Sequence, residues 1–453
     1  MRHLTLGEIT RRSGGVLRAS DPETLVLGFA TDHREILHGD LFLAVRGSRV
    51  DGHDFVDEAL LRGAVGAMVE RPMDGPVIHV DNLVGALAMF GASCRNEFSG
   101  PVVGITGSNG KTSAKEFTAA ALLPLGNVVK NAGNRNTEYT SPLIWADVVT
   151  STRAVVAEMA MRGAGQIAHL ASFHRPSVAI VTMIGTAHIE MVGNNREGIA
   201  QAKTEIFRGL DDTGIAICWA EDDYYPYLYS QAPGEVFTFG FSPEADCRIT
   251  GYRPLDWDRS EIRGELDGVV FSTEIRTVGK HQARNAAAAL LAARACGVKV
   301  QDAAEAIRHA ELPPMRMERR TIAGLEVILD NYNASPDSTS VALRTLVEVV
   351  GTRPWSAVLG EMKELGDFSE LGHRLVGRAV AETSPDAIVA YGEATGWMVD
   401  EAIGLGYPGA RITRASTLDD VAEWLARRPE GESVLIKGSR ALELERALER
   451  LPA

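Results

Sequence analysis

Short apolar runs and helically spaced apolar positions alternate along the first hundred residues. Residues 55–61 and 83–94 carry apolar side chains at helical spacing, and the segment 96–101 (Asn-Glu-Phe-Ser-Gly-Pro) breaks the second of these helices. Four apolar runs predict β-strands, at residues 25–29, 41–45, 66–69 and 77–80. The pattern therefore predicts a small N-terminal α/β domain over residues 1–98.

From residue 102 onwards the pattern changes to continuous apolar runs separated by helices. Such runs are typical of a parallel sheet whose two faces are both covered. The predicted strands are 102–105, 154–157, 178–182 and 215–218, and the clearest helices are 285–295 and 302–309. Because Pro313 and Pro314 interrupt the pattern, we expect a central domain over residues 99–312.

The alternation of strands and helices restarts after these prolines. Strands are expected at residues 326–329, 356–359, 387–390, 411–413 and 434–436, with helices between them. This order is typical of a compact Rossmann-like domain, here over residues 313–453. The predicted fold class is α/β in three domains.

The composition is that of an ordinary globular protein and changes the picture in one respect. Of the 453 residues, 45% are hydrophobic and 23% are charged. The formal net charge is −14, from 46 Lys and Arg against 60 Asp and Glu, and no long run of basic residues interrupts it. We therefore expect no nucleic-acid partner.

The cysteines and the apolar runs indicate where the protein works. Cys94, Cys218, Cys247 and Cys296 are widely spaced, which predicts reduced and mostly buried thiols rather than a disulfide framework or a zinc site. No stretch approaches the roughly 18 consecutive apolar residues that span a bilayer, and the N-terminus has no apolar core. We expect a cytoplasmic protein without membrane insertion.

The strongest local signal is an apolar strand, a glycine-rich turn and a helix, over residues 102–112 (Val-Val-Gly-Ile-Thr-Gly-Ser-Asn-Gly-Lys-Thr). Gly107 and Gly110 would let backbone N–H groups approach phosphate oxygens at the positive end of the helix. Lys111 would contact the outer phosphates and Thr112 would reach Mg²⁺. The common phosphate-loop pattern has glycine where this chain has Ile105, so the alternative is a glycine-rich turn with a chance lysine.

Two further polar residues are expected at the same edge of the sheet. Glu158 follows the predicted strand 154–157, and His188 follows the strand 178–182. Ligands bind beyond the carboxyl ends of parallel strands, and Mg²⁺ prefers few protein ligands together with phosphate oxygens. The alternative for each residue alone is a loop carboxylate or a loop histidine with its hydrogen bonds satisfied.

Lys203 lies in a predicted helix over residues 199–207, next to the apolar side that includes Ile199 and Ile206. Its position is compatible with a surface lysine that lies along the helix, and the residues alone do not decide between that role and a functional one.

The loop Thr106-Gly-Ser-Asn-Gly-Lys-Thr112 resembles the nucleotide loop of the Mur ligases, and the resemblance extends over essentially the whole chain. These enzymes join amino acids or peptides to the UDP-muramoyl precursor of bacterial peptidoglycan. The resemblance implies ATP and Mg²⁺ as cofactors and implies that Lys203 carries a CO₂-derived carbamate. The implied catalytic residues are Lys111, Glu158, His188 and Lys203, and the implied metal ligands are Thr112, Glu158, His188 and Lys203 as the carbamate.

The resemblance also implies an ATP site built from two domains. The implied ATP-binding residues are Gly107, Ser108, Asn109, Gly110, Lys111, Thr112, Ser113, His281, Asn285, Arg316 and Asp330, with Arg316 at a phosphate and Asp330 at the ribose. Gln282 stands where the family usually has asparagine, so no role is assigned to it.

Several segments resemble the members of this family that add D-alanyl-D-alanine to UDP-N-acetylmuramoyl-tripeptide. They lie at residues 31–34, 39–42, 51–55, 134–136, 330–336, 359–366 (with His373) and 437–440. A D-N-P-R motif, which marks the diaminopimelate-adding relatives, is absent from the sequence. The implied substrate-binding residues are Thr31, Asp32, Arg34, Asp51, His53, Asn134, Asn136, Tyr332, Asn333, Lys437 and Ser439. A monomer whose partners are these small molecules is expected.

Two alternative hypotheses about the function are compatible with the same phosphate loop. A folylpolyglutamate synthase or a cyanophycin-type polymerising ligase would act on a different carboxylate; the N-terminal segments around Asp32 and Asp51 argue against the first, and the three-domain length argues against the second. A nucleotide-dependent binding switch would need no metal site to activate a carboxylate, so Glu158, His188 and Lys203 together argue against it.

Overall fold

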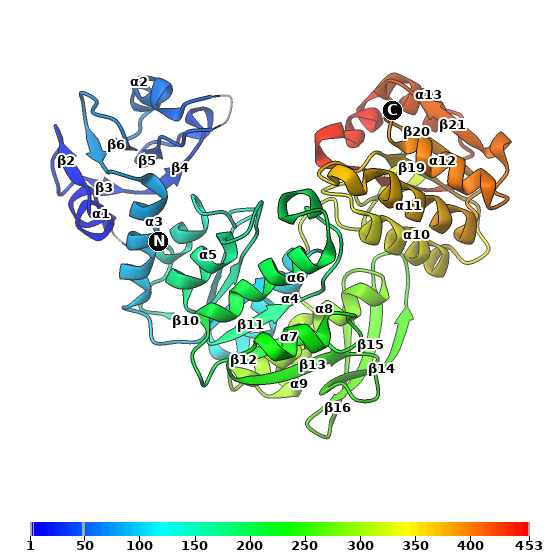
Figure 1. Ribbon diagram of the computed structural model, residues 1–453, viewed down its shortest axis with the longest axis horizontal. Helices are drawn as coiled ribbons and strands as arrows, with labels where there is room; N and C mark the ends of the chain where they lie inside the picture. The colour runs from blue at the N-terminus through cyan, green and yellow to red at the C-terminus, as the bar shows by residue number, and fades with distance from the viewer. Residues whose placement is uncertain (1, 3, 48–49, 452–453) are drawn as a thin grey trace.

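The computed structural model describes residues 2, 4–47 and 50–451, so the outermost limits of the predicted domains, positions 1 and 453, lie outside the described residues. Figure 1 shows three bodies in an open V: an N-terminal body in blue, a central body running from cyan to light green, and a C-terminal body from yellow to red. The N-terminal and C-terminal bodies form the arms and both contact the central one. The predicted α/β fold class in three parts is confirmed.

The N-terminal body is built on a five-stranded sheet of order β2-β7-β6-β5-β4, parallel except for β2. Its strands are β2 (Val16–Arg18), β4 (Gly28–Ala30), β5 (Asp40–Leu43), β6 (Gly66–Val69) and β7 (Val77–His79), and a small antiparallel pair joins β1 (Leu4–Thr5) to β3 (Leu25–Val26). The helices are α1 (Leu6–Ser13), α2 (Val56–Leu61) and α3 (Leu83–Arg95), with 3₁₀ segments η1 (His33–Glu35) and η2 (Gly52–Phe55).

One prediction in this body is wrong. The single strand expected at residues 25–29 is divided into β3 and β4, which belong to different sheets. The chain changes sheets at Leu27, whose side chain is exposed, and Gly28 approaches the Asp40 carboxylate so closely that a Cβ atom would lie 2.2 Å from Oδ1. An apolar run alone does not reveal such a change of sheet.

The central body contains a nine-stranded sheet of order β16-β15-β14-β13-β12-β11-β8-β10-β9. Its strands are β8 (Val102–Thr106), β9 (Asn127–Lys130), β10 (Thr152–Glu158), β11 (Val178–Val181), β12 (Ile215–Trp219), β13 (Glu235–Gly240), β14 (Cys247–Pro254), β15 (Ser260–Leu266) and β16 (Val269–Ile275). The helices are α4 (Lys111–Ala121), α5 (Gln166–His174), α6 (Arg196–Thr204), α7 (Tyr225–Gln231), α8 (Lys280–Ala295) and α9 (Val300–Ile307), with 3₁₀ segments η3 (Leu123–Leu125), η4 (Ser141–Ala146), η5 (Ile189–Val192) and η6 (Glu205–Gly209).

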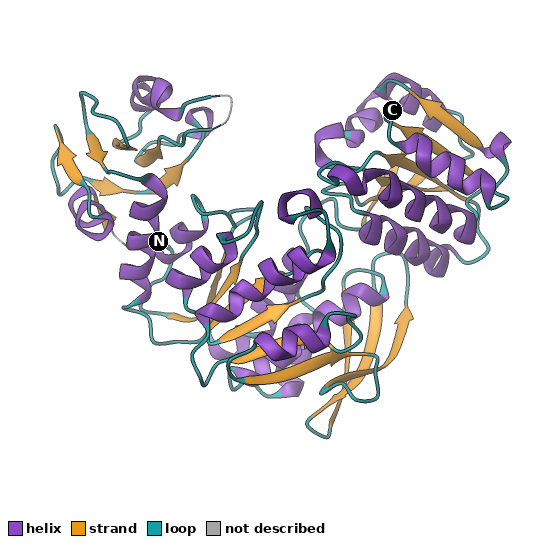
Figure 2. Cartoon of the chain, in the orientation of Figure 1, coloured by secondary structure: helices purple, strands orange, loops and turns teal. Residues whose placement is uncertain are grey.

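Helices cover both faces of this sheet, as Figure 2 shows. Alternate residues of β11 face opposite sides: Val178 and Ile180 pack in one core with α4, α8 and α9, and Ala179 and Val181 pack in another with α5 and α6. Strands β8 to β13 run parallel, which confirms the parallel sheet for the four strands that were predicted in it.

Beyond the predicted strands, one end of the central sheet contains antiparallel pairs. Strand β14 still runs parallel to β13, and the pairs β14–β15 and β15–β16 are antiparallel. Along these strands buried residues alternate with exposed ones, as in β15, where Ile262 and Leu266 are buried and Arg263 and Glu265 are exposed. This is the pattern of a sheet covered on one face, and it is weaker than the continuous runs that identified the buried parallel strands.

The C-terminal body contains a six-stranded sheet of order β17-β18-β22-β19-β20-β21, parallel except for the edge strand β17. The strands are β17 (Glu318–Ile322), β18 (Leu325–Leu329), β19 (Trp355–Gly360), β20 (Ala387–Tyr391), β21 (Ile412–Ala415) and β22 (Ser433–Lys437). The helices are α10 (Pro336–Val350), α11 (Ser369–Thr383), α12 (Thr395–Gly404) and α13 (Leu418–Ala426), with 3₁₀ segments η7 (Gly366–Phe368), η8 (Gly409–Arg411), η9 (Arg440–Leu442) and η10 (Leu444–Arg450).

The cysteines and the helices bear on where the protein works. Cys94, Cys218 and Cys247 are buried and Cys296 is partly buried, and all four are free thiols, as predicted. Among the described residues, none of the helices combines the length and apolarity needed to cross a membrane.

Candidate active site

The glycine-rich turn between β8 and α4 has the geometry of a phosphate loop. Gly107 has φ 144° and a Cβ atom there would lie 1.9 Å from Thr182 Oγ1, and Gly110 has φ 84° and would meet Asn285 Oδ1 at 2.7 Å. Only glycine fits these two positions. Helix α4 begins at Lys111 without a side-chain cap, so the first-turn N–H groups of this helix are available to an anion.

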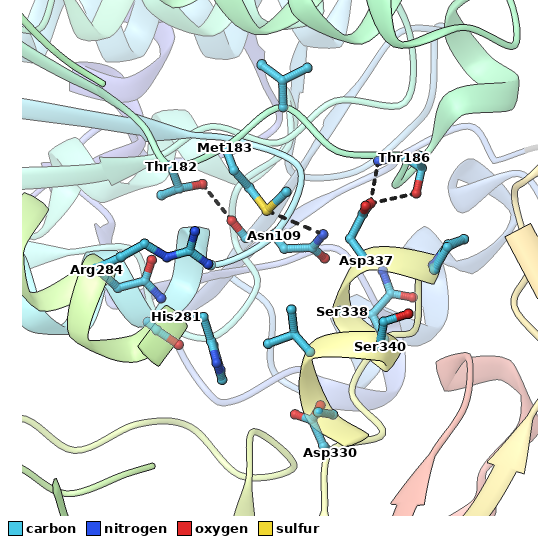
Figure 3. A pocket seen from close by; sticks show the side chains of 18 of the residues that line it. Asn109, Thr182, Met183, Thr186, His281, Arg284, Asp330, Asp337, Ser338 and Ser340 are labelled. Carbon is cyan, nitrogen blue, oxygen red and sulfur yellow. Dashed lines mark hydrogen bonds between the residues drawn. The ribbon is translucent and has the colours of Figure 1, made fainter. Parts of the chain in front are cut away.

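The loop is held in shape by the end of the neighbouring strand β11. Thr182 Oγ1 donates to the Asn109 carbonyl at 2.6 Å, Ser108 N donates to the Met183 carbonyl at 2.9 Å, and Gly185 N donates to Ser108 Oγ at 2.9 Å. Figure 3 shows the first of these bonds. Three hydrogen bonds to a single neighbouring segment therefore stabilise the loop conformation.

Lys111 is folded back on its own loop. Its Nζ donates to the Gly107 carbonyl at 2.8 Å, and burial lowers its pKa while the Glu158 carboxylate opposes that shift. The ammonium therefore lies where the loop would cradle a phosphate, with backbone oxygens as its partners in this structure.

Glu158, at the end of β10, lies directly beside the first turn of α4. Its Oε1 accepts from Thr112 Oγ1 at 3.2 Å and from Asn136 Nδ2 at 2.8 Å, and its backbone N donates to Asn131 Oδ1 at 2.7 Å. Its buried Oε2 has no hydrogen-bond partner among the described residues. A buried carboxylate oxygen left in this way next to a threonine hydroxyl suits a hard cation.

Lys115 is a member of this cluster that the sequence did not reveal. It is fully buried, donates to the carbonyls of Asn131 and Gly133 at 3.0 and 3.2 Å, and lies 3.7 Å from Glu158 Oε2. Its place one turn after Lys111 on α4 is the only signal that could have suggested it, because i and i+4 share a helix face.

Lys203 is a buried residue and not the surface lysine of the alternative. Helix α6 ends one residue after it, its side chain is fully inaccessible, and its Nζ has no hydrogen-bond partner within the described part of the chain. Burial, reinforced by the nearby charge of Lys111, lowers its pKa well below the usual range, against the opposing effect of Glu205 and Glu158. Burying an amine without a hydrogen-bond partner costs free energy, so we expect a further group to bind to the Lys203 nitrogen.

His188 is held by the C-terminal body. It adopts a left-handed conformation with φ 62°, and its Nδ1 lies 2.5 Å from Glu364 Oε2, which follows β19. The His188 imidazole beside it lowers the pKa of Glu364. Among the described residues no set of three or more His, Cys, Asp or Glu side chains is gathered closely enough to hold a metal by itself. A Mg²⁺ ion at this edge would need substrate oxygens, as the prediction assumed.

A cavity of about 610 Å³ lies between the central and C-terminal bodies beside the phosphate loop. The structure brings seven of the predicted ATP-binding residues to its wall: Asn109, Gly110, Ser113, His281, Asn285, Arg316 and Asp330. Trp219, Arg284 and Thr182 also line it and were not predicted. Burial, with the nearby charges of Arg284 and Lys437, lowers the pKa of His281 to about 3, so this imidazole is neutral.

Arg316 and Asp330 reach the cavity from the C-terminal body. Arg316 Nη2 donates to Thr112 Oγ1 at 2.9 Å, and its guanidinium lies 4.4 Å from the centroid of the Tyr332 ring. Asp330 accepts from Met317 N at 3.1 Å and from Lys437 Nζ at 2.6 Å. Arg316 thus contacts the phosphate loop across the junction.

Three of the predicted substrate-binding residues also line this cavity: Tyr332, Asn333 and Lys437. Lys437 is buried and donates to the Asp330 carboxylate and to the carbonyls of Asp330 and Asn333, at 2.6, 2.9 and 3.1 Å. Ser439 Oγ accepts from Lys363 N at 2.8 Å. Since Lys437 has three acceptors within its own body, its contacts are those of a residue that positions the loop after β18.

The predicted substrate residues of the N-terminal body lie apart from the cavity. Asp32 pairs with Arg34 at 2.6 Å, and Thr31 precedes this pair on the surface. His53 is buried and uses both ring nitrogens, at 2.6 Å from Asp51 Oδ1 and 2.9 Å from Glu70 N. In the central body, Asn136 Nδ2 donates to Glu158, whereas Asn134 is exposed.

A three-domain α/β protein that places a phosphate loop and a buried lysine–carboxylate cluster against a Rossmann-like body belongs to the class of nucleotide-using ligases. Three family profiles match the chain: "Mur ligase family, catalytic domain" over residues 28–89, "Mur ligase middle domain" over 105–293 and "Mur ligase, glutamate ligase domain" over 315–440. The chain belongs to the Mur ligase family.

Relatives and solved structures agree with this assignment over the full length. UDP-N-acetylmuramoyl-tripeptide--D-alanyl-D-alanine ligase of Bacillus subtilis is 31% identical over 438 residues, which are 95% of this chain and 94% of the relative. MurF from Acinetobacter baumannii superposes with a TM-score of 0.89 at 28% identity, covering 100% of this chain and 99% of that one. MurF ligase from Thermotoga maritima, solved in complex with ADP, gives 0.79 at 31% identity, covering 93% and 96%.

Proposed function

We propose that this protein is an ATP-dependent ligase that adds D-alanyl-D-alanine to UDP-N-acetylmuramoyl-tripeptide, giving the pentapeptide precursor of peptidoglycan. The observation that carries the proposal is the cluster of Lys111, Thr112, Glu158 and Lys203 beside a cavity that both bodies line. Full-length relatives named for this reaction support it. We further propose that the enzyme works in the cytoplasm as a monomer and serves cell-wall biogenesis.

The reaction is a condensation in two steps. A carboxylate oxygen of the UDP-tripeptide attacks the γ-phosphorus of ATP, so that a new O–P bond forms, the bond to the bridging oxygen breaks, and ADP leaves. The amine of D-alanyl-D-alanine then attacks the acyl carbon; the C–N bond forms, phosphate leaves, and the nitrogen loses one proton. A free carboxylate is a poor acyl donor to an amine, so phosphorylation makes the second step feasible.

The protein's contribution is to position groups and neutralise charge. The backbone from Gly107 to Ser113 cradles the phosphates, and Lys111 exchanges its loop carbonyls for phosphate oxygens. Arg316 contacts a phosphate, Asp330 contacts the ribose, and His281 and Asn285 line the nucleotide cavity.

The residues at the sheet edge fit Mg²⁺ and a carbamate. Thr112 and Glu158 would hold one ion, and His188 with carbamylated Lys203 a second. Glu158 Oε2 and the Lys203 amine, neither of which has a hydrogen-bond partner among the described residues, are the two groups that would bind these partners. Bound Mg²⁺ would screen the triphosphate and the transferring phosphoryl group.

The carbamate follows from the same buried amine. The neutral Lys203 nitrogen adds to the carbon of CO₂, a C–N bond forms, and one proton is released. Protein exchanged into ¹³C-bicarbonate should give a carbamate carbon resonance that Lys203→Ala lacks, and the variant should lose activity. A fully active Lys203→Ala enzyme would end this part of the proposal.

We propose that the three parts divide the substrates between them. Residues 1–98 bind the UDP moiety through Thr31, Asp32 and Arg34, with Asp51 and His53 fixing the adjacent turn. Residues 99–312 bind ATP and, through Asn134 and Asn136, the peptide, and residues 313–453 contribute Tyr332, Asn333, Lys437 and Ser439. Because the site is divided, substrate binding should draw the bodies together; an unchanged small-angle scattering radius with both substrates would contradict this.

The deciding experiment is phosphate release with ATP and Mg²⁺, adding UDP-N-acetylmuramoyl-tripeptide and D-alanyl-D-alanine separately and together. Release that requires both, with a UDP-pentapeptide detected by mass spectrometry, supports the proposal. Release with a single amino acid in place of the dipeptide would assign the chain to another reaction of the family, and release without any acceptor would favour a nucleotide-dependent switch.

A further inference from the structure

Two arginine–aromatic pairs line the cavity, and they differ in how their charges are used. The Arg316 guanidinium lies 4.4 Å from the Tyr332 centroid and also donates to Thr112 Oγ1, so this pair is committed to the phosphate loop. The Arg284 guanidinium lies closer to its ring, 3.9 Å from the Trp219 centroid. Arg284 makes no side-chain hydrogen bond or ion pair to any residue that the structure describes.

The acidic neighbours of Arg284 are engaged elsewhere. Glu221 Oε1 accepts from the backbone N of Phe241 and Ser242 at 2.6 and 2.7 Å. Asp222 accepts from the backbone N of Ile184 and Tyr224 at 2.7 and 2.9 Å. Arg284 is therefore a partly buried, planar cation whose own partners are a ring on one face and a cavity on the other.

The position of this pair fits the distance from phosphates to a base. Trp219 ends β12, which is two strands from β8 through β11, so the two strand ends are separated by about 10 Å at roughly 4.8 Å per strand. On α8, Arg284 is next in sequence to Asn285, whose amide lies against Gly110 of the loop. A ribose and one phosphate span such a gap. Figure 3 shows Arg284 and His281 on one wall of the cavity, with Asp330 and Asp337 from the C-terminal body opposite.

We propose that Trp219 and Arg284 form the platform on which the adenine of ATP stacks, in the order indole, guanidinium, base. The proposal rests on ATP being the nucleotide of the proposed function. A guanidinium stacks on rings through its flat face and keeps its N–H donors at the rim, which a lysine ammonium cannot do. Trp219 Nε1 is buried and has no hydrogen-bond partner among the described residues, so the indole is held by its packing against the core and by the Arg284 guanidinium.

The test compares ATP with inorganic tripolyphosphate, which fills the phosphate loop but has no base. Arg284→Lys should weaken Mg²⁺–ATP binding about 10-fold, the size of one lost base-stacking contact, and change tripolyphosphate binding by less than about twofold. Both dissociation constants are measured by calorimetry. Arg294→Lys is the matched control, since Arg294 lies on the same helix, 5.1 Å from the Phe237 centroid, and is absent from the cavity lining; both constants should stay unchanged.

A second measurement, of tryptophan fluorescence, does not require Arg284→Lys to fold. ATP should quench tryptophan emission in the wild-type protein and tripolyphosphate should not, and Trp219→Phe should lose that quenching. The proposal is overturned if Arg284→Lys leaves ATP binding unchanged, if tripolyphosphate binding weakens as much as ATP binding, or if the quenching persists in Trp219→Phe.

The outcomes separate this inference from the proposed reaction. ATP binding with the Trp219 response but without formation of a UDP-pentapeptide would refute the reaction and leave the platform in place. Pentapeptide formation with an unaltered KM for ATP in Arg284→Lys would refute the platform and leave the reaction in place.

Discussion

The two junctions of the central body differ in kind. At the N-terminal junction, helix α3 packs against η4 and α5, and a single hydrophobic core contains Phe90 of α3 together with Leu143 and Trp145 of η4. Trp145 Nε1 donates to His174 Nδ1 at 3.1 Å, and the other ring nitrogen of His174 donates to Ser141 Oγ at 2.8 Å. The N-terminal and central bodies therefore share one hydrophobic core at this junction.

At the C-terminal junction, polar contacts surround the nucleotide cavity. Asp337 accepts two hydrogen bonds from Thr186, at 2.6 and 2.7 Å, and His188 pairs with Glu364. Apolar residues also meet here, since one hydrophobic cluster contains Ile189 of the central body and Leu365 of the C-terminal body. Trp257, from the turn between β14 and β15, lies 4.2 Å from the guanidinium of Arg353.

The difference indicates which arm can move. Separating the N-terminal arm would expose the core around Trp145, whereas the hydrogen bonds and the ion pair around the C-terminal cavity can be exchanged for water at small cost. The proposed reaction requires a site that admits ATP and excludes water from an acyl phosphate, and such a site needs its moving part at the second kind of junction.

The largest effect is expected from Trp145→Ala. Trp145 is fully buried, and removing its ring leaves a cavity and an unpaired His174 nitrogen, so the free energy of unfolding should fall by about 3–5 kcal/mol. Urea unfolding followed by circular dichroism measures it. Leu123→Ala, at an exposed position, should change little and serves as the control. A loss below about 1 kcal/mol would mean that the N-terminal arm is not fixed by this core.

The second prediction concerns the polar junction. Asp337→Ala should weaken the association of the C-terminal body with the central body by about 1–3 kcal/mol, because two partly buried hydrogen bonds are lost. The radius of gyration from small-angle scattering should rise, and the KM for ATP should rise with it. Thr186→Val removes one of the same bonds, so the double variant should be less than additive. Fully additive losses would show that the two residues do not act as one contact.

Part of this architecture was predictable from the sequence because buried parallel strands are continuous apolar runs. Strand β6 was found at the predicted bounds, and β8, β10, β11 and β12 within one or two residues of them. The antiparallel strands β14 to β16 and the charged edge strand β17 were missed, since half of their residues face solvent. A run of apolar letters does not show where a chain leaves one sheet for another, as at Leu27.

The same limit applies to the site. Lys111 and Glu158 could be placed because they follow strands at a known edge of the sheet. The contacts of Lys115 and of the Trp219–Arg284 pair depend on which helix packs over which strand end. The pattern of the sequence does not reveal that packing. Lys203 needed the family resemblance, because the helical pattern around it fits a surface lysine equally well.

The third prediction uses acid to weaken the N-terminal junction. Burial lowers the pKa of His174 to about 3, while an unfolded chain has the ordinary histidine value of about 6.5. Below pH 6.5 the unfolded state binds a proton that the folded state does not bind. The free energy of unfolding therefore falls as the pH drops towards 3, by about 1.4 kcal/mol per pH unit. Above pH 6.5 this group contributes no pH dependence.

His174→Gln should reduce the difference in melting temperature between about pH 7.5 and about pH 5.5, because the titrating group is gone. His309→Gln, at an exposed position, is the control and should leave that difference as in the wild type. An unaltered difference in His174→Gln would place the acid sensitivity elsewhere in the molecule.

The smallest effect is expected from Glu364→Gln at the C-terminal junction. The His188–Glu364 pair is partly exposed, with 23% and 43% of the two side chains accessible, so its loss should cost less than about 1 kcal/mol. Salt near 1 M should reproduce much of that loss in the wild type, since exposed pairs are screened. Glu382→Gln, which breaks an exposed pair within the C-terminal body, is the control and should leave the scattering radius unchanged. If Glu364→Gln cost as much as Trp145→Ala, the two junctions would be equally rigid, and the C-terminal arm would no longer be the moving one.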